Sequence, residues 1–176
     1  SSDLLEAGGE TTPYLVLEWC EGRDLGDELE ERRGRGGRSP KELWPLFAPV
    51  ADALAHAHAL GFVHRDVKPA NLLFGDDDRL RIADFGLARA LAEASWTEPE
   101  GVVLGTARYV SPEQAAGLPC DTRSDLYSLA LVLVECVTGE VPYTGDTALT
   151  TLAARAGRSI EADPAVFGPL APLIEA

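Results

Sequence analysis

The chain has 176 residues, of which 45% are hydrophobic and 25% charged, and this is the composition of one globular domain with a core. A net charge of -14 argues against a surface that binds nucleic acid or anionic membranes. The 3 cysteines lie far apart, so they indicate neither a zinc site nor a secreted disulfide framework, and we expect reduced thiols in a cytosol. The longest apolar run, 129–134, is far shorter than the roughly 20 residues that cross a bilayer. The chain has no methionine and no signal peptide, which indicates an excerpt from a longer protein.

The first predicted elements are a strand and a short helix. The run Tyr-Leu-Val-Leu-Glu at 14–18 is typical of a strand. Glu-Gly-Arg-Asp at 21–24 is a turn that opens a short helix ending at Glu31. A glycine- and arginine-rich loop over 34–38 follows.

A long helix is predicted after that loop. Ser39 supplies an N-cap and Pro40 the first helical residue of a helix of about twenty residues with regularly spaced apolar side chains. Pro45 and Pro49 each remove a backbone donor and clash with the preceding turn. We therefore expect a kink or a late start.

The middle of the chain predicts a hairpin and a long loop. Short apolar strands at 72–74 and 80–83 flank the turn Gly-Asp-Asp-Asp-Arg. The stretch 84–117 has little periodicity, and a loop of that length in a compact domain is usually functional.

The last part of the chain is predicted to be helical. An apolar helix over 121–138 has Asp121 or Thr122 as its cap and Gly139 just after its end, and we expect it to be buried because it is hydrophobic on most sides. Weaker patterns predict helices over 146–156 and from Gly168.

The segment His64 to Asn71 carries the first chemical motif. Lys68 follows Asp66 by two residues and Asn71 follows it by five, so one loop presents a proton acceptor, a cation and a neutral oxygen ligand to one point. Phosphoryl transfer needs these groups to orient a hydroxyl, neutralise phosphate charge and hold magnesium. Taken alone, His-Arg-Asp fits a core histidine beside a surface ion pair better than a catalytic motif, and it is Lys68 and Asn71 that favour the catalytic interpretation.

The second motif is Asp84-Phe85-Gly86, which directly follows the second predicted strand. It begins 18 residues after Asp66. This position places a second carboxylate beside Asn71 for a second metal contact.

In their order, these motifs resemble the Hanks-type (eukaryotic-like) serine/threonine protein kinases. The resemblance implies a mainly α fold, the C-lobe of the protein kinase-like α+β fold with short β-hairpins. Residues 1–24 would be the last strand of the N-terminal β-lobe and the hinge, and residues 25–176 the C-lobe, truncated near its end. The glycine-rich loop and strand lysine of the small lobe do not occur before Tyr14, so the isolated chain is expected to be inactive.

The resemblance also assigns the catalytic positions. Asp66 resembles the catalytic base and Lys68 the lysine that contacts the transferred phosphate. Asn71 and Asp84 resemble the ligands of Mg²⁺ (or Mn²⁺). Thr106, in the run Gly-Thr-Ala-Arg-Tyr, would hydrogen-bond near Asp66 and favour Ser/Thr substrates.

Nucleotide and regulatory positions follow from the same resemblance. The ATP-binding positions are Leu17 at the gatekeeper site, Glu18, Cys20, Asp24 and Leu73. Arg65 resembles the arginine that pairs with a phosphorylated activation segment, in which Ser95 and Thr97 are the candidate acceptors. Solvated loop hydroxyls and a surface arginine are the plainer interpretation.

Structural positions are assigned to His64, Phe85, Glu113 and Asp125. Asp125 resembles the buried aspartate that ties the catalytic loop to the central helix, although a helix-capping carboxylate is the alternative. The arginine that pairs with Glu113 in the family is expected beyond Ala176. Ser111 stands where the family usually has alanine, a small change.

The parent protein is expected to be a kinase that transfers the ATP γ-phosphoryl group to Ser/Thr hydroxyls of protein substrates, with self-association for autophosphorylation and no nucleic-acid partner. A pseudokinase or docking scaffold is the alternative, which retention of the four catalytic-site residues disfavours. A small-molecule phosphotransferase of the aminoglycoside or choline kinase type is disfavoured by the segment 105–113. The arginine-rich, lysine-poor composition and the run at 105–114 resemble bacterial members. We expect a cytoplasmic kinase domain, and this chain has no membrane segment. Some bacterial members of the family carry a membrane anchor, so the parent protein could be anchored in the same way.

Overall fold

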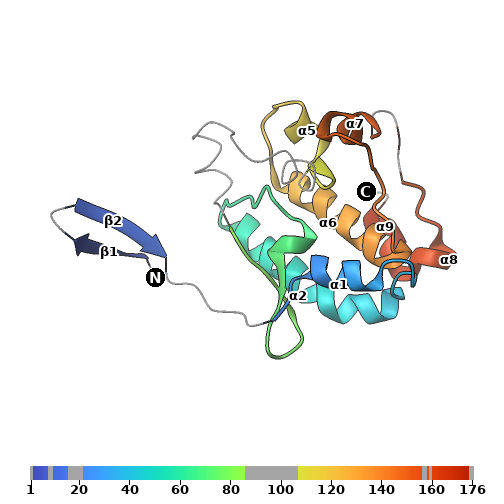
Figure 1. Cartoon of the computed structure of the whole chain (residues 1–176), viewed down its shortest axis with the longest axis horizontal. Helices are drawn as coiled ribbons and strands as arrows, with labels where there is room; N and C mark the ends of the chain where they lie inside the picture. Colours follow the sequence, from blue (N-terminus) through green and yellow to red (C-terminus); the bar gives the residue numbers. More distant parts are fainter. Residues whose placement is uncertain are drawn as a thin grey trace.

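The computed structural model describes residues 2–7, 10–15, 22–85, 107–155, 158 and 160–174, and these are mainly helical (Figure 1). Strands β1 (Ser2–Ala7) and β2 (Glu10–Leu15) pair antiparallel, with Ser2 opposite Leu15. The strand predicted over 14–18 overlaps the end of β2, and its remaining residues lie outside the described part.

Helix α1 (Leu25–Arg32) confirms the predicted turn and short helix. Asp24 is its N-cap, and the Asp24 carboxylate accepts a hydrogen bond from the Asp27 amide at 2.9 Å. A carboxylate at this position satisfies one of the amides that a helix start leaves without a partner.

Helix α2 (Pro40–Ala59) has the start and length predicted from Ser39 and Pro40. Of the two effects expected from the internal prolines, a kink or a late start, the late start does not occur. The Glu42 carboxylate accepts from the Ser39 amide and hydroxyl, so a capping box stabilises the first turn. One face of the helix is buried from its first to its fourth turn, and its buried side chains are Leu43, Phe47, Val50 and Leu54. This burial outweighs the hydrogen bonds lost at the prolines within the helix.

The predicted hairpin is confirmed. The short helix η1 (Pro69–Asn71) leads into β3 (Leu72–Phe74), which pairs antiparallel with β4 (Leu80–Ile82). The Gly75 amide donates to the Arg79 carbonyl at 2.9 Å and closes the turn. Of the predicted loop over 84–117, the residues from 107 onward are described, and they include helix α5 (Pro112–Ala115).

Helix α6 (Thr122–Thr138) confirms the predicted buried helix. The Asp121 side chain caps it, and Gly139 ends it with a left-handed φ of 76°. Buried side chains occur on most sides of α6, which packs against α2 and α9 (Figure 1). The main core therefore lies around this helix, with contributions from α1, α2 and the β3–β4 hairpin.

The C-terminal part is helical, as predicted, and the helix predicted over 146–156 is shorter in the structure. Helix α7 (Ala148–Ala153) begins late because Thr147 caps it, and it lies within the predicted range of 146–156. Helix α8 (Pro164–Phe167), η2 (Gly168–Leu170) and α9 (Ala171–Ile174) follow in direct succession. Among the described residues, no helix is both long enough and apolar enough to span a membrane. Cys120 and Cys136 are free thiols, and Cys20 lies outside the described residues.

Candidate active site

Two side chains of the 64–71 loop converge on the carboxylate of a third, Asp66. Asp66 Oδ2 accepts from Lys68 Nζ at 2.8 Å and from Asn71 Nδ2 at 3.0 Å. Asn71 Nδ2 also donates to the Asp66 carbonyl at 2.8 Å, and the Asn71 side chain is buried. Helix η1 brings this about, because its single turn folds Asn71 back toward Asp66. The loop thus gathers an acid, a cation and an amide as the spacing predicted.

Asp125, on the first turn of α6, binds the main chain of this loop with its side chain. Its side chain is fully buried. Oδ2 accepts from the His64 amide at 2.8 Å, and Oδ1 accepts from the Arg65 amide at 2.7 Å. The alternative role of helix cap falls to Asp121.

His58 is a site residue that sequence reasoning missed. Its Nε2 lies 2.7 Å from Asp125 Oδ2, and because a carboxylate oxygen accepts, the imidazole is the donor. His58 belongs to the last turn of α2, outside any motif. Only the packing of α2 on α6 brings it to Asp125, so no local signal in the sequence reveals it.

The His64 ring connects the loop to the strand before Asp84. Its Nε2 donates to the Ala83 carbonyl at 2.8 Å, and its Nδ1 accepts from the Asp66 amide at 3.2 Å. The two bonds require the same tautomer, with the proton on Nε2, because a carbonyl only accepts. The Phe85 ring packs edge-on against the imidazole, with centroids 4.6 Å apart.

Two residues of the site have left-handed backbone conformations. Arg65 has φ of 68° and Asp84 has φ of 62°. For residues other than glycine such conformations cost roughly 1 to 3 kcal/mol each, and they persist where the surroundings hold them. At Arg65, the amide bond to Asp125 and a bond from Gln114 Nε2 to the Arg65 carbonyl, at 2.7 Å, supply that hold.

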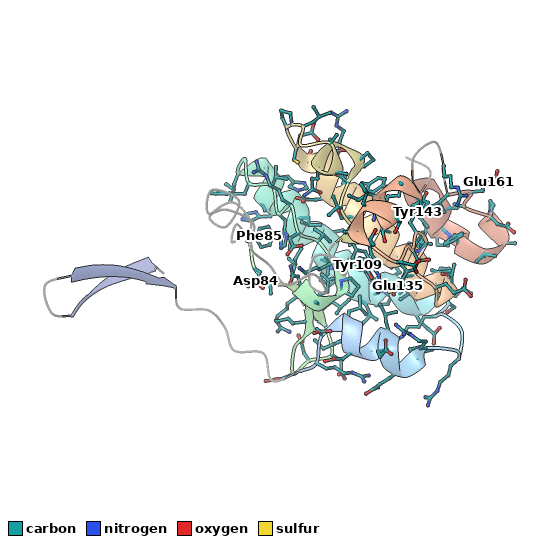
Figure 2. All side chains as sticks on the ribbon, turned by 45° about the horizontal axis from the view of Figure 1, so that its top comes forward. Asp84, Phe85, Tyr109, Glu135, Tyr143 and Glu161 are labelled. Atoms are coloured by element: carbon teal, nitrogen blue, oxygen red, sulfur yellow. The ribbon has the colours of Figure 1, made fainter. Side chains whose placement is uncertain are left out.

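Asp84 and Asn71 lie at the ends of the β3–β4 hairpin. The Ala83 amide donates to the Asn71 carbonyl at 2.9 Å, which aligns the two ends. Figure 2 shows Asp84 and Phe85 at one edge of the helical body, where Asp84 is exposed. Because Asn71 Nδ2 is used by Asp66, Oδ1 is the Asn71 atom that would bind a cation. A carboxylate and an amide oxygen suit a hard divalent metal ion.

Two of the predicted nucleotide-binding residues are brought together. Asp24 and Leu73 pair in an isolated antiparallel bridge beside the start of α1. The Phe74 amide donates to the Arg23 carbonyl at 3.0 Å and extends this contact. The remaining predicted nucleotide-binding residues, Leu17, Glu18 and Cys20, lie outside the described residues. So do the predicted phosphorylation sites Ser95 and Thr97 and the predicted catalytic residue Thr106.

Residues near the end of the long loop pack against helix α6. The Tyr109 hydroxyl donates to Glu135 Oε2 at 2.5 Å, and the two side chains meet within the helical body in Figure 2. Both line a cavity of about 500 Å³ between α1 and the C-terminal end of α6, which Arg108 also lines. Burial raises the pKa of Tyr109, and the Glu135 carboxylate raises it further. Burial also raises the pKa of Glu135, although the bond from Tyr109 acts in the opposite direction.

Glu113, whose expected arginine partner is not among the described residues, pairs with a hydroxyl. Ser124 Oγ donates to its Oε1. Burial alone would raise the pKa of Glu113, but hydrogen bonds from Ser124, from its own backbone and from Ser111 together hold it below the ordinary value. Ser111 is fully buried and caps α5, which gives the serine a structural role at the position where alanine was expected.

Comparison with known proteins agrees with this geometry. Residues 4–163 match the protein kinase domain family. The chain is 44% identical over 160 residues to the serine/threonine-protein kinase PknL of Mycobacterium tuberculosis, which covers 91% of the chain and 39% of PknL. It is 42% identical over 135 residues to the serine/threonine-protein kinase PknB of Mycobacterium leprae, which covers 77% of the chain and 21% of PknB. The chain thus spans well under half the length of these relatives.

The match over most of its length shows that the chain belongs to the protein kinase family. Its relatives are bacterial serine/threonine kinases, so it is one of the bacterial Hanks-type members. The expected fold class is confirmed, since the helical body with its short hairpin is that of the kinase C-lobe.

Proposed function

We propose that the protein is a serine/threonine protein kinase that transfers the γ-phosphoryl group of ATP to hydroxyls of protein substrates. The observation that carries this proposal is the convergence of Lys68 and Asn71 on the Asp66 carboxylate. A scaffold domain has no need of a buried asparagine and a lysine directed at one acid.

Asp66 accepts the proton of the substrate hydroxyl in this proposal. Lys68 supplies a positive charge at the same point, where negative charge on the transferred group has to be neutralised. His64 and Asp125 hold the backbone of the loop that carries Asp66, and the bonds from Asn71 and Lys68 orient its carboxylate. Such positioning is the main contribution that a kinase makes to phosphoryl transfer.

Asn71 and Asp84 are the proposed ligands for Mg²⁺ or Mn²⁺, which neutralises phosphate charge when it is bound with ATP. Asp24 and Leu73 are the described residues proposed to line the nucleotide site, and their pairing beside α1 supports this role. Residues 1–24 are proposed to be the last small-lobe strand and the hinge, and residues 25–176 the C-lobe.

Regulation and location belong to the same proposal. Arg65 is proposed to pair with a phosphorylated residue of the activation segment, with Ser95 and Thr97 as acceptors in autophosphorylation between two copies. The kinase domain is proposed to work in the cytoplasm on protein substrates, whether or not the parent protein carries a membrane anchor as some bacterial members do.

The test uses the full-length protein with Mg-ATP and a serine- or threonine-containing protein substrate. Asp66→Asn is expected to lower kcat about 100- to 10,000-fold, because it removes the proton acceptor and leaves the size of the side chain unchanged. Asp76→Asn, in the exposed hairpin turn, is the matched control and should retain activity. A wild-type protein that binds no nucleotide and transfers no phosphate would favour the scaffold over the kinase.

A further inference from the structure

The segment 107–111 is held in place by side chains from distant parts of the chain. Ser128 Oγ donates to the Tyr109 carbonyl at 2.7 Å, and the Tyr109 hydroxyl donates to Glu135. A buried carbonyl that loses its partner costs roughly 1 to 3 kcal/mol. Side chains that satisfy these groups therefore fix the backbone of the segment.

Arg155 supplies two further bonds to this segment. It follows α7 directly, and only 7% of its surface is exposed. Its Nη1 donates to the Val110 carbonyl and its Nη2 to the Ala107 carbonyl. The guanidinium also lies over the Tyr143 ring, 5.7 Å from the ring centroid.

Burial is unfavourable for this cation. It lowers the pKa of Arg155, and the phenols of Tyr127 and Tyr143 act in the opposite direction. Within the described part of the chain, no carboxylate forms an ion pair with Arg155, and its buried Nε has no hydrogen-bond partner. An uncharged side chain of similar length would fill the space without desolvating a charge. What arginine adds is a planar fork of donors that can join two carbonyls.

We propose that Arg155 is a positioning residue for the protein substrate. By joining the carbonyls of Ala107 and Val110, it holds the segment 107–111 in the conformation that receives the substrate chain. This inference rests on the proposed function and on a second premise, implied by the resemblance to kinases, that the segment 105–113 binds the peptide around the acceptor hydroxyl. The role of Arg155 could not be predicted from the sequence, because its hydrogen-bond partners lie 45 and 48 residues away along the chain.

Gln114 links the clamped segment to the 64–71 loop. Its Nε2 donates to the Arg65 carbonyl at 2.7 Å, and its Oε1 accepts from the Ser111 amide at 3.1 Å. The segment and the residue next to Asp66 therefore share one bridging side chain. A shift of the segment changes where a bound substrate lies relative to Asp66, while the contacts of Asp66 with Lys68 stay within the loop.

The experiment compares Arg155→Met, Arg155→Lys and the control Arg158→Met in the full-length protein. Arg158 is exposed and lies three residues further along the chain. Arg155→Met is expected to raise KM for a peptide substrate about tenfold and to leave KM for ATP unchanged, because a positioning role acts on the substrate side only. Arg155→Lys keeps one donor group and should raise KM for the peptide substrate by a smaller factor. Hydrogen exchange of the amides in 107–111 should be faster in Arg155→Met than in the control.

Two results would overturn the positioning role. One is a KM for ATP that rises in proportion to KM for the peptide, and the other is unchanged hydrogen exchange in 107–111. If Arg155→Met does not fold, Arg155→Lys decides by the same two measurements. If the wild-type protein transfers no phosphate, the proposed function fails, and hydrogen exchange still decides whether Arg155 fixes the segment.

Discussion

At the scale of single residues, Asp125 shows how one buried carboxylate can position a loop that has no regular structure. Each oxygen accepts a backbone amide of the 64–71 loop, and His58 donates a third bond. The left-handed conformation of Arg65 depends on this hold. This carboxylate therefore stabilises the backbone conformation of the loop, and it does so by hydrogen bonds and not by apolar packing.

Replacing Asp125 by asparagine is expected to destabilise the folded protein by roughly 3 kcal/mol, because the amide group presents donors where two amides and an imidazole also donate. Urea unfolding of the full-length protein measures the change. Asp52→Asn is the matched control, since Asp52 is exposed on α2 and should change the stability by less than about 0.5 kcal/mol. Equal stability of the two variants would contradict the anchoring role.

Glu135 makes stability depend on pH. Burial raises its pKa, so the folded state binds a proton more tightly than the unfolded state, whose glutamate has a pKa of about 4.3. This carboxyl group therefore lowers the stability as the pH rises from about 4.3 through its raised folded-state value. Glu135→Gln should match the wild type below that window and become relatively more stable above it. Urea unfolding at a series of pH values tests this, with the exposed Glu140→Gln as control. A constant difference across the series would disprove it.

The residues of the site were predictable only where they lie close together in the sequence. Asp66, Lys68 and Asn71 share one loop, so their spacing indicated their convergence. His58 and Arg155 act on residues that are distant along the chain, and only the packed helices bring them there.

At the scale of elements, helix ends were the most predictable feature. Asp121 caps α6 and Gly139 ends it, as the local sequence indicated, because a cap depends on neighbouring residues alone. The start of α2 at Pro40 was also indicated by its cap, whereas the late start that Pro45 and Pro49 suggested does not occur, because the buried face of the helix stabilises it. Core burial is a property of the whole fold and does not appear in a local pattern.

Gly139 combines a left-handed backbone with close packing. A Cβ atom there would lie 3.2 Å from the Gly36 carbonyl carbon and the Gly37 nitrogen. Gly139→Ala is expected to cost about 1 to 2 kcal/mol, from the conformation and the close contact together. Gly34→Ala is the control for conformation alone, since Gly34 has φ of 75° with nothing within 4 Å of its Cβ position. Thermal unfolding should rank Gly139→Ala below Gly34→Ala, and the reverse order would remove the packing argument.

At the scale of the whole molecule, helix α6 organises both parts of the site. Asp125 on its first turn holds the 64–71 loop, while Ser128 and Glu135 further along hold the segment 107–111. The distance between the proposed proton acceptor and the segment 107–111, proposed to receive the substrate, is therefore set by the geometry of one buried helix.

This arrangement predicts an order of hydrogen exchange in the full-length protein. Helix α6 is surrounded by the core, so its amides should exchange only when the C-lobe unfolds globally. Helix α7 is short, half of its side chains are exposed, and its capping box between Thr147 and Thr150 is local, so its amides should exchange through local opening and much faster. Exchange measured by mass spectrometry distinguishes the two helices. Equal protection of α7 and α6 would mean that the lobe unfolds as one unit, and the central role assigned to α6 would then be lost.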